Sequence, residues 1–180
     1  LNCGGSFFEL PAENAGGVAK IRPVSSHRRR LQDFASYRGL LVLSGVSADA
    51  PAAGGHVVRS TDGAVALWVG AVDDLWRFGR PVGRGGPWKE TSVAAGVASD
   101  PYLMNGYDRK ALSLSHRADR EVRVRVEVDL TGTGQWVTYA TLAVPAGRTV
   151  EHVFPAGYQA CWLRVSADAA TTATAWLAYD

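Results

Sequence analysis

The segment EVRVRVEVDL, residues 121–130, decides the fold class of this chain. Every second position is apolar and nearly every position between carries a charge, which is the period-two pattern of a β-strand with one buried and one solvated face. The face predicted to be buried consists of Val122, Val124, Val126, Val128 and Leu130. The pattern therefore predicts an antiparallel strand at the edge of a hydrophobic core.

The residues after this strand predict a hairpin and then a sandwich. TGTG at 131–134 is turn chemistry, and the next strand is expected at 135–144. Its predicted inner face is Trp136, Ala140, Leu142 and Val144. Further strands are expected at 110–116, 149–154, 160–166 and 171–179. About six strands in roughly 75 residues, joined by short turns, indicate an antiparallel β-sandwich, which we expect over 106–180.

The first half of the chain also has β character, with less regular alternation. RGLLVLSG at 38–45 is nearly all apolar and predicts a strand buried on both faces. Segments 56–59 and 64–70 predict two strands joined by a turn at Asp62-Gly63, and 72–78 continues the β pattern. We therefore expect an all-β chain whose residues 1–105 form a region of blade-like sheets ahead of the sandwich.

Composition excludes several classes of protein. Apolar residues make up 47% and charged residues 20% of the 180 residues, as in folded soluble domains. No run approaches the roughly 20 apolar residues that cross a bilayer, so no membrane span is expected. The arginines at 28–30 have no aromatic stacking motif or recognition helix beside them, so no nucleic-acid partner is expected. The chain begins at Leu1 without a signal-peptide pattern; a secreted or periplasmic location is compatible with it.

The cysteines and histidines do not form a recognisable metal motif. Cys3 and Cys161 lie near opposite ends, and the sequence leaves open whether they form a disulfide or two thiols. Four histidines without ligand spacing predict neither a metal site nor a cofactor. His27 and Asp33 flank the arginine run, where they either share a site or act as ordinary loop residues.

The candidate functional residues gather around 68–79, WVGAVDDLWRFG. This segment places two carboxylates, two indoles and a guanidinium after a buried strand, where loops often carry function. Carboxylates and arginines bind sugar hydroxyls, and aromatic rings stack on the C–H face of a sugar. The predicted sugar-binding residues are Trp68, Trp76, Arg77, Trp88, Tyr107 and His27. For Trp88 and Tyr107 the alternative is that they fill the gap between the two halves.

Paired carboxylates predict glycoside hydrolysis, which needs two carboxyl groups on either side of the scissile bond. Asp73 and Asp74 point to opposite sides if the strand continues, so a second carboxylate would come from elsewhere. The candidate catalytic residues are Asp73, Asp74, Asp33 and Glu90. The alternative is that Asp73 and Asp74 cap a turn and pair with Arg77 or Arg80.

Four segments resemble the last blades of uncharacterised bacterial β-propeller proteins: IRPVSSH, DFASYRGLLVLSG, LWVGAVDDLWRFGRPVGRGGPW and SDPYLMNGYD. The resemblance implies propeller blades followed by a small β-sandwich, with propeller glycosidases as distant analogues. Roughly two blades of 40–45 residues fit the first half, too few to close a ring.

Three functions follow as hypotheses. The first is a glycoside hydrolase acting on a carbohydrate through paired carboxylates. The second is a non-catalytic carbohydrate-binding module, and the third is a structural or assembly domain. Because an exposed apolar strand edge such as 38–45 would recruit another chain, we also expect a homo-oligomer.

Overall fold

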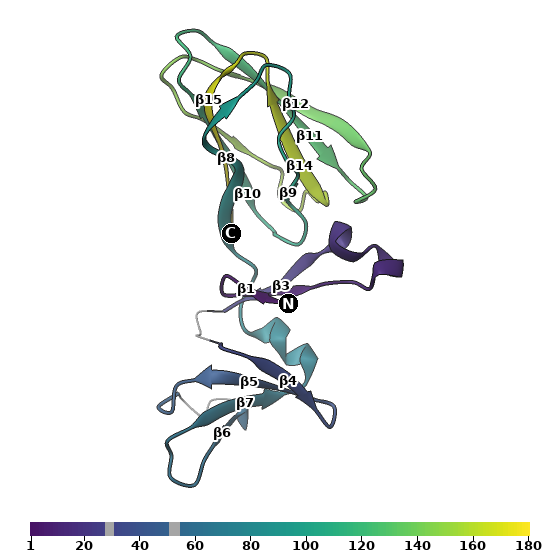
Figure 1. The fold of residues 1–180 in the computed structure, drawn as a ribbon, viewed down its shortest axis with the longest axis vertical. Helices are drawn as coiled ribbons and strands as arrows, with labels where there is room; N and C mark the ends of the chain where they lie inside the picture. Colours follow the sequence, from purple (N-terminus) through teal and green to yellow (C-terminus); the bar gives the residue numbers. More distant parts are fainter. Residues whose placement is uncertain (28–30, 51–54) are drawn as a thin grey trace. The chain divides into compact units, whose positions relative to one another are not determined.

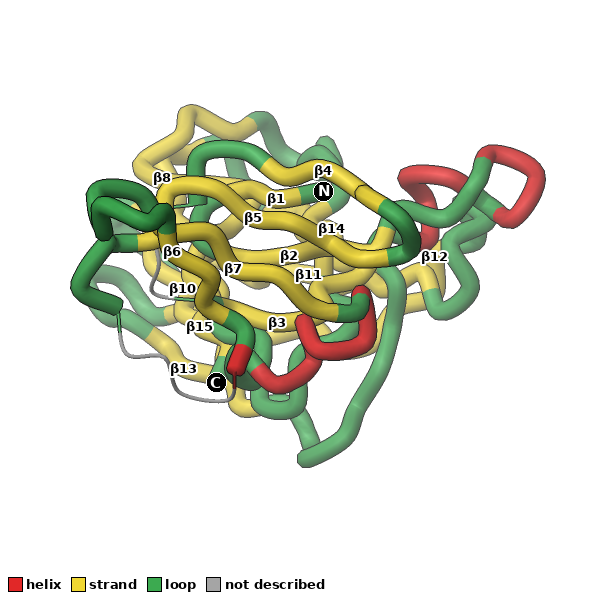
Figure 2. The backbone as a smooth tube through the Cα atoms, turned by 90° about the horizontal axis from the view of Figure 1, so that it is seen from below, coloured by secondary structure: helices red, strands yellow, loops and turns green. Residues whose placement is uncertain are grey.

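The computed structural model describes residues 1–27, 31–50 and 55–180, and this part of the chain is all-β. Its strands form four antiparallel sheets, and its helices are short 3-10 turns (Figures 1 and 2). Among the described residues no helix is long and apolar enough to cross a membrane. The arginine run at 28–30 lies outside the described residues. The prediction of an all-β fold is confirmed.

The chain divides into two compact units. The first consists of Leu1–Phe8 and Val24–Arg80, and the second consists of Glu9–Pro23 and Pro81–Asp180. The predicted boundary near residue 105 differs from this division, because β8 (Gly83–Val93) and β9 (Tyr102–Leu103) pair with strands of the second unit. Pairing between strands about 80 residues apart leaves no local pattern in the sequence, so the sequence does not indicate that these strands belong to the second unit.

The second unit is the predicted β-sandwich. One sheet has the order β13-β10-β15-β8 and the other β12-β11-β14-β9. The remaining strands are β10 (Lys110–His116), β11 (Val122–Asp129), β12 (Trp136–Val144), β13 (Val150–Val153), β14 (Trp162–Ala167) and β15 (Thr171–Tyr179). All six strands expected from alternation are present within two residues of their predicted ends.

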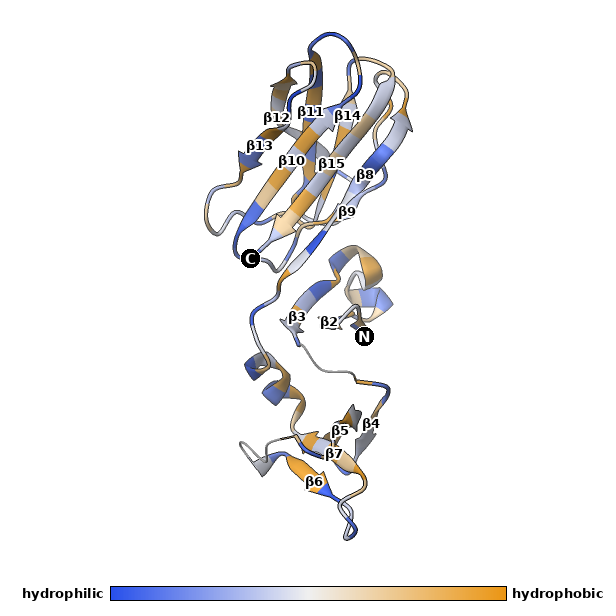
Figure 3. Cartoon of the chain, turned by 90° about the vertical axis from the view of Figure 1, so that its left-hand side faces the viewer, coloured by the Kyte–Doolittle hydropathy of each residue, from blue (hydrophilic) through white to orange (hydrophobic). Residues whose placement is uncertain are grey.

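The alternating valines of β11 form the centre of the sandwich core. Val122, Val124, Val126 and Val128 are each at most 4% exposed. They share one cluster with inner-face residues of both sheets, among them Leu112, Leu114, Leu163, Val165 and Leu177. Figure 3 shows hydrophobic residues along β10 and β15 as well, because alternate side chains of these strands also face the core. Leu130 lies beyond the end of β11 and is 52% exposed, so its predicted place in the core is wrong.

The β11–β12 hairpin contains a bulge that changes which residues face the core. Its register runs from Val122 opposite Val144 to Asp129 opposite Trp136, with a shift between Val126 and Glu127. One extra residue on β12 inverts the alternation beyond it. Leu142 and Val144 therefore face inward as predicted, whereas Trp136 lies on the outer face with Asp129.

The first unit is built on a four-stranded sheet. Its order is β4-β5-β7-β6, formed by Phe34–Tyr37, Leu40–Val46, Ala66–Gly70 and Val57–Arg59. The hairpin predicted around Asp62-Gly63 is present between β6 and β7. Its core contains Phe7, Leu41, Leu43, Trp68 and Leu75. The sheet has four strands, as a propeller blade does, but β7 lies between β5 and β6, out of sequence order.

Three predictions for the first unit are wrong. The segment 38–45 forms β5, which pairs with β4 on one side and β7 on the other, so it is not an exposed edge. Its residues alternate between buried and partly exposed, which means that only one face is covered. Segment 72–78 forms the 3-10 helix η4 (Val72–Arg77) in place of a strand. Self-association stays a prediction, but the exposed strand edge at 38–45 on which it was based is not present.

The remaining elements are short. Strands β1 (Asn2–Cys3), β2 (Ser6–Glu9) and β3 (Arg22–Ser26) form a three-stranded sheet in the order β1-β2-β3. The helices η1 (Glu13–Ala15) and η2 (Gly17–Lys20) lie between β2 and β3 in the chain. Cys3, in the first unit, and Cys161, in the second, are both free cysteines in the structure.

Candidate functional site

Two tryptophans flank a buried carboxylate on the outer face of the sandwich. Asp129, the last residue of β11, lies opposite Trp136 of β12 on one side and Trp162 of β14 on the other. Residues directly opposite each other in a sheet point to the same face. The three side chains therefore form one row across three strands, at the end of β11 that leads into the 131–134 turn.

The carboxylate of Asp129 organises the turn that follows it. Oδ1 accepts hydrogen bonds from the backbone N–H groups of Thr131 at 3.1 Å, Gly132 at 2.9 Å and Thr133 at 3.4 Å. Oδ2 accepts one from Gly134 at 2.7 Å. Gly132 and Gly134 have φ values of +69° and +80°, which glycine adopts without strain. The sequence TGTG folds as a turn around this one side chain, so the turn interpretation holds.

The same hydrogen bonds fix the ionisation state of Asp129. Burial of the side chain would by itself raise its pKa, but the four backbone donors together outweigh burial and lower the pKa below the ordinary value of 3.8. Asp129 is 2% exposed and stays a carboxylate at neutral pH. The Asp129 carboxylate can orient the turn and contribute a negative charge to the site, but it has no proton to donate at neutral pH.

Helix η2 (Gly17–Lys20) of the same unit forms one wall of the site. The Trp162 indole Nε1–H donates to the carbonyl of Ala19 at 2.7 Å, which fixes the plane of that ring. A Cβ atom at Gly132 would lie 2.6 Å from the same carbonyl oxygen, so only glycine allows the turn to approach η2 this closely. The result is an open pocket of about 440 Å³ lined by Val18, Ala19, Pro101, Asp129, Gly132, Gly134, Trp136 and Trp162.

A stacked ion pair supports the second tryptophan. The Arg164 guanidinium lies over the Trp136 ring, 4.4 Å from its centroid. Its Nε–H donates to Glu127 Oε2 at 2.9 Å. Glu127 and Arg164 are cross-strand neighbours one row below Asp129 and Trp162. Trp136 is thus held on one face by a cation that has its own counterion, while the indole still borders the pocket.

The predicted residues in the first unit are divided between its core and its surface. Trp68 is 3% exposed, stacks on His56 and packs in the core, and His27 is 7% exposed with its Nε2 3.0 Å from Asn2 Oδ1. Trp76 is the exposed indole of the segment, at 52%. Asp33 is exposed, and its Oδ1 accepts from the adjacent backbone N–H of Phe34.

Asp74 caps η4, as the alternative interpretation of the Asp-Asp pair proposed. Its Oδ2 accepts from the Ala71 N–H at 2.8 Å, and its Oδ1 lies 3.5 Å from Nη1 of Arg77. Asp73 is exposed on the same helical turn. The two carboxylates are therefore on a helix start, and the strand geometry assumed for them does not apply.

Replacement of Asp74 tests this assignment. We expect Asp74→Ala to destabilise the first unit by about 1 kcal/mol, the typical value for loss of a helix cap, as measured by urea denaturation. Asp73→Ala is the matched control and should change the stability by less than half of that. Equal effects of the two substitutions would contradict the capping role.

The other predicted residues belong to the second unit. Trp88 is 5% and Tyr107 6% exposed, and both lie within the sandwich core, which is neither a sugar-binding surface nor the gap between the two halves that the alternative proposed. Tyr107 stacks on Tyr179 with centroids 4.0 Å apart. Burial, with a smaller contribution from Tyr102, raises the pKa of Tyr107 to about 12, which keeps its phenol protonated.

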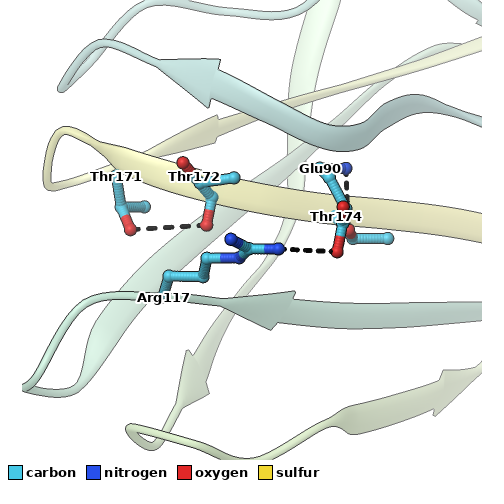
Figure 4. A network of polar contacts seen from close by, with 5 residues as sticks. All are labelled: Glu90, Arg117, Thr171, Thr172 and Thr174. Carbon is cyan, nitrogen blue, oxygen red and sulfur yellow. Dashed lines mark hydrogen bonds and ion pairs between the residues drawn. The ribbon is translucent and has the colours of Figure 1, made fainter.

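Glu90 takes part in a surface network on the opposite sheet (Figure 4). Its carboxylate accepts from Arg117 at 2.9 Å, and its backbone N–H donates to Thr174 Oγ1 at 3.0 Å. Both members of the ion pair are more than two-thirds exposed. Such a pair contributes little to stability, and among the described residues Glu90 is the carboxylate that pairs with Arg117.

The sequence could have indicated Asp129 but not its neighbours. An aspartate directly before TGTG is a signal for a side chain that caps a turn. The position of Trp136 depends on a bulge, and the contact of Trp162 depends on η2, more than 140 residues earlier in the chain. Neither has a local sequence signal.

Comparison with known proteins assigns this chain to no family. No family model and no curated protein matches the chain. A solved structure titled "Crystal structure of PirA" is similar over 56% of this chain and 92% of its own, with 10% identical residues and a TM-score of 0.29. A similarity of this size supports no statement about fold or function.

Proposed function

We propose that the sandwich unit binds carbohydrate, without cleaving it, in the pocket between Trp136 and Trp162. The observation that carries this proposal is the row of two partly exposed indoles on either side of Asp129. Of the functions considered from the sequence, this is the non-catalytic carbohydrate-binding module, with a different set of residues.

The pocket offers the chemistry that a sugar needs. Indole rings supply a flat apolar surface for the C–H face of a pyranose, with little loss of conformational entropy because both rings are already held. Trp162 is fixed by Ala19, and Trp136 by Arg164. Glu127 and Arg164, beside the pocket, can exchange hydrogen bonds with hydroxyl groups. The pocket volume also lies in the usual range for small-molecule sites.

The electrostatics favour binding over hydrolysis at this pocket. A glycosidase needs one carboxyl group that holds a proton at working pH, which requires a raised pKa. Asp129 is the acidic residue that lines the pocket, and its pKa is lowered. Both of its oxygens already accept backbone hydrogen bonds. Glu127 nearby is paired with Arg164 at 2.9 Å. Neither carboxylate is arranged as a general acid.

The glycosidase hypothesis based on Asp33, Asp73, Asp74 and Glu90 stays a prediction. Asp74 is occupied as a helix cap, and Glu90, in the other unit, is paired with Arg117. Release of chromophore from an aryl-glycoside by the wild-type chain, lost in Asp73→Asn, would revive it.

A glycan array with two tryptophan variants tests the proposal. Wild type should bind at least one glycan class, and Trp136→Ala should bind that class about ten- to hundredfold more weakly, as expected for an aromatic anchor. Trp76→Ala, which removes the exposed indole of the first unit, is the matched control and should bind like wild type. Retained affinity in a folded Trp136→Ala, or loss in Trp76→Ala, would contradict the proposal.

A further inference from the structure

We propose that the ligand is an acidic glycan, and that Arg125 and Arg123 bind its anionic groups beyond the tryptophan pocket. The inference rests on the proposed function and extends it to a class of ligand. It starts from the outer face of β11, where positions 123, 125, 127 and 129 follow one another toward the pocket.

The charges along this face are balanced near the pocket and unbalanced away from it. Asp129 is enclosed by backbone donors, and Glu127 is paired with Arg164. Arg125 and Arg123 are exposed, and neither forms an ion pair with any residue that the structure describes. The face therefore presents two guanidinium groups without a counterion among the described residues along β11, on the strand whose end lies between the two indoles.

The neighbours of these arginines leave them accessible. Arg125 lies between Thr141 of β12 and Ser166 of β14, and Arg123 lies opposite Ala143. These cross-strand neighbours are small, and both arginines are exposed. Asp168 lies beside Arg123 and accepts its backbone N–H at 2.9 Å. Its carboxylate offsets part of the charge at Arg123, which makes Arg125 the stronger anion-binding position.

The spacing suits a linear polymer. Two residues along a strand advance by about 6.7 Å, so Arg125 lies about 13 Å along the strand from Asp129. An oligosaccharide with one sugar in the pocket between the indoles and its next sugars running along β11 would pass over both arginines. The planar guanidinium forms paired hydrogen bonds with a carboxylate, and it also binds a sulfate ester. Uronic acids and sulfated sugars thus share the chemistry that this face recognises.

Binding of matched oligosaccharides by the full chain tests the inference. The probes are a uronic acid oligosaccharide, its methyl-esterified form, which keeps the rings and removes the charge, a sulfated oligosaccharide and a single-stranded oligonucleotide of similar charge. We expect the acidic sugars to bind at least tenfold more tightly than the neutral form. Preference between uronate and sulfate identifies the anion.

Variants separate this inference from the proposed function. Arg125→Gln should weaken binding of the acidic sugar about tenfold or more, with a smaller effect for Arg123→Gln, and should leave the neutral form unchanged. Arg84→Gln, an exposed arginine on β8 of the other sheet, is the control.

Unchanged acidic-sugar affinity in Arg125→Gln, together with loss in Trp136→Ala, would overturn the acidic preference and leave carbohydrate binding intact. Absence of binding to every sugar would overturn both. Tighter binding of the oligonucleotide than of any sugar would also contradict the inference, because arginines beside aromatic rings are a feature of single-strand nucleic-acid sites as well.

Discussion

Val124→Asp is expected to unfold the sandwich unit or to lower its free energy of unfolding by several kcal/mol. Val124 is 4% exposed and lies between Val122 and Val126 on the inner face of β11. A carboxylate at this position would be buried without a partner, and the chain would either protonate it or open the core. Thermal and urea denaturation followed by tryptophan fluorescence measure the loss.

Arg125→Asp is the matched control for this experiment, because it places the same side chain on the outer face of the same strand. Its effect on the free energy of unfolding should stay within about 0.5 kcal/mol. Wild-type stability of Val124→Asp would contradict the assignment of β11 and of the core built on it.

The second large effect is expected for Asp129→Ala, at about 3 kcal/mol of lost stability. Removal of the carboxylate leaves four N–H groups of residues 131–134 without their acceptor. Water can reach part of the turn, so the loss is smaller than four full hydrogen bonds to a charge. Asp100→Ala, at an exposed aspartate of the same unit, should be close to neutral. A loss no larger than that of the control would contradict the turn assignment.

The pH dependence of stability follows from the same contacts. Because the pKa of Asp129 is lower in the folded chain than its ordinary value of 3.8, the unfolded chain binds more protons as the pH falls through this range. The stabilisation is fully present above the unfolded pKa and is lost below it as Asp129 is protonated. Asp129→Asn should therefore show a shallower acid loss of stability than wild type. Equal slopes between pH 5 and pH 2 would contradict this account.

The sequence predicted the sandwich well because alternation is a local signal. Each strand from β10 to β15 carries its own period-two pattern or its own turns, and each was found within two residues. Strand β8 carries Gly and Pro and pairs with β15 at the far end of the chain, so it has no alternating pattern that would indicate a strand. Local patterns predict strands; they do not predict distant partners.

The site was predicted poorly for related reasons. Segment 68–79 concentrates carboxylates and indoles in the sequence, but Trp68 turns into the core and Asp74 caps η4. The row of Trp136, Asp129 and Trp162 is assembled across three strands, and the bulge in β12 moves Trp136 to the outer face. Functional side chains that are close in the sequence were therefore a weaker indication of the site than the strand register, which brings distant residues together across a sheet.

The indole N–H signals in a two-dimensional ¹H–¹⁵N NMR spectrum test the central claim most directly. The chain has 6 tryptophans and therefore 6 such signals, which single replacements to Phe assign. On titration with a glycan selected from the array, the signals of Trp136 and Trp162 should shift together to saturation, while those of Trp68, Trp76, Trp88 and Trp176 stay in place. A shift at Trp76 without one at Trp136, or no shift at all in the presence of saturating glycan, would contradict binding in this pocket.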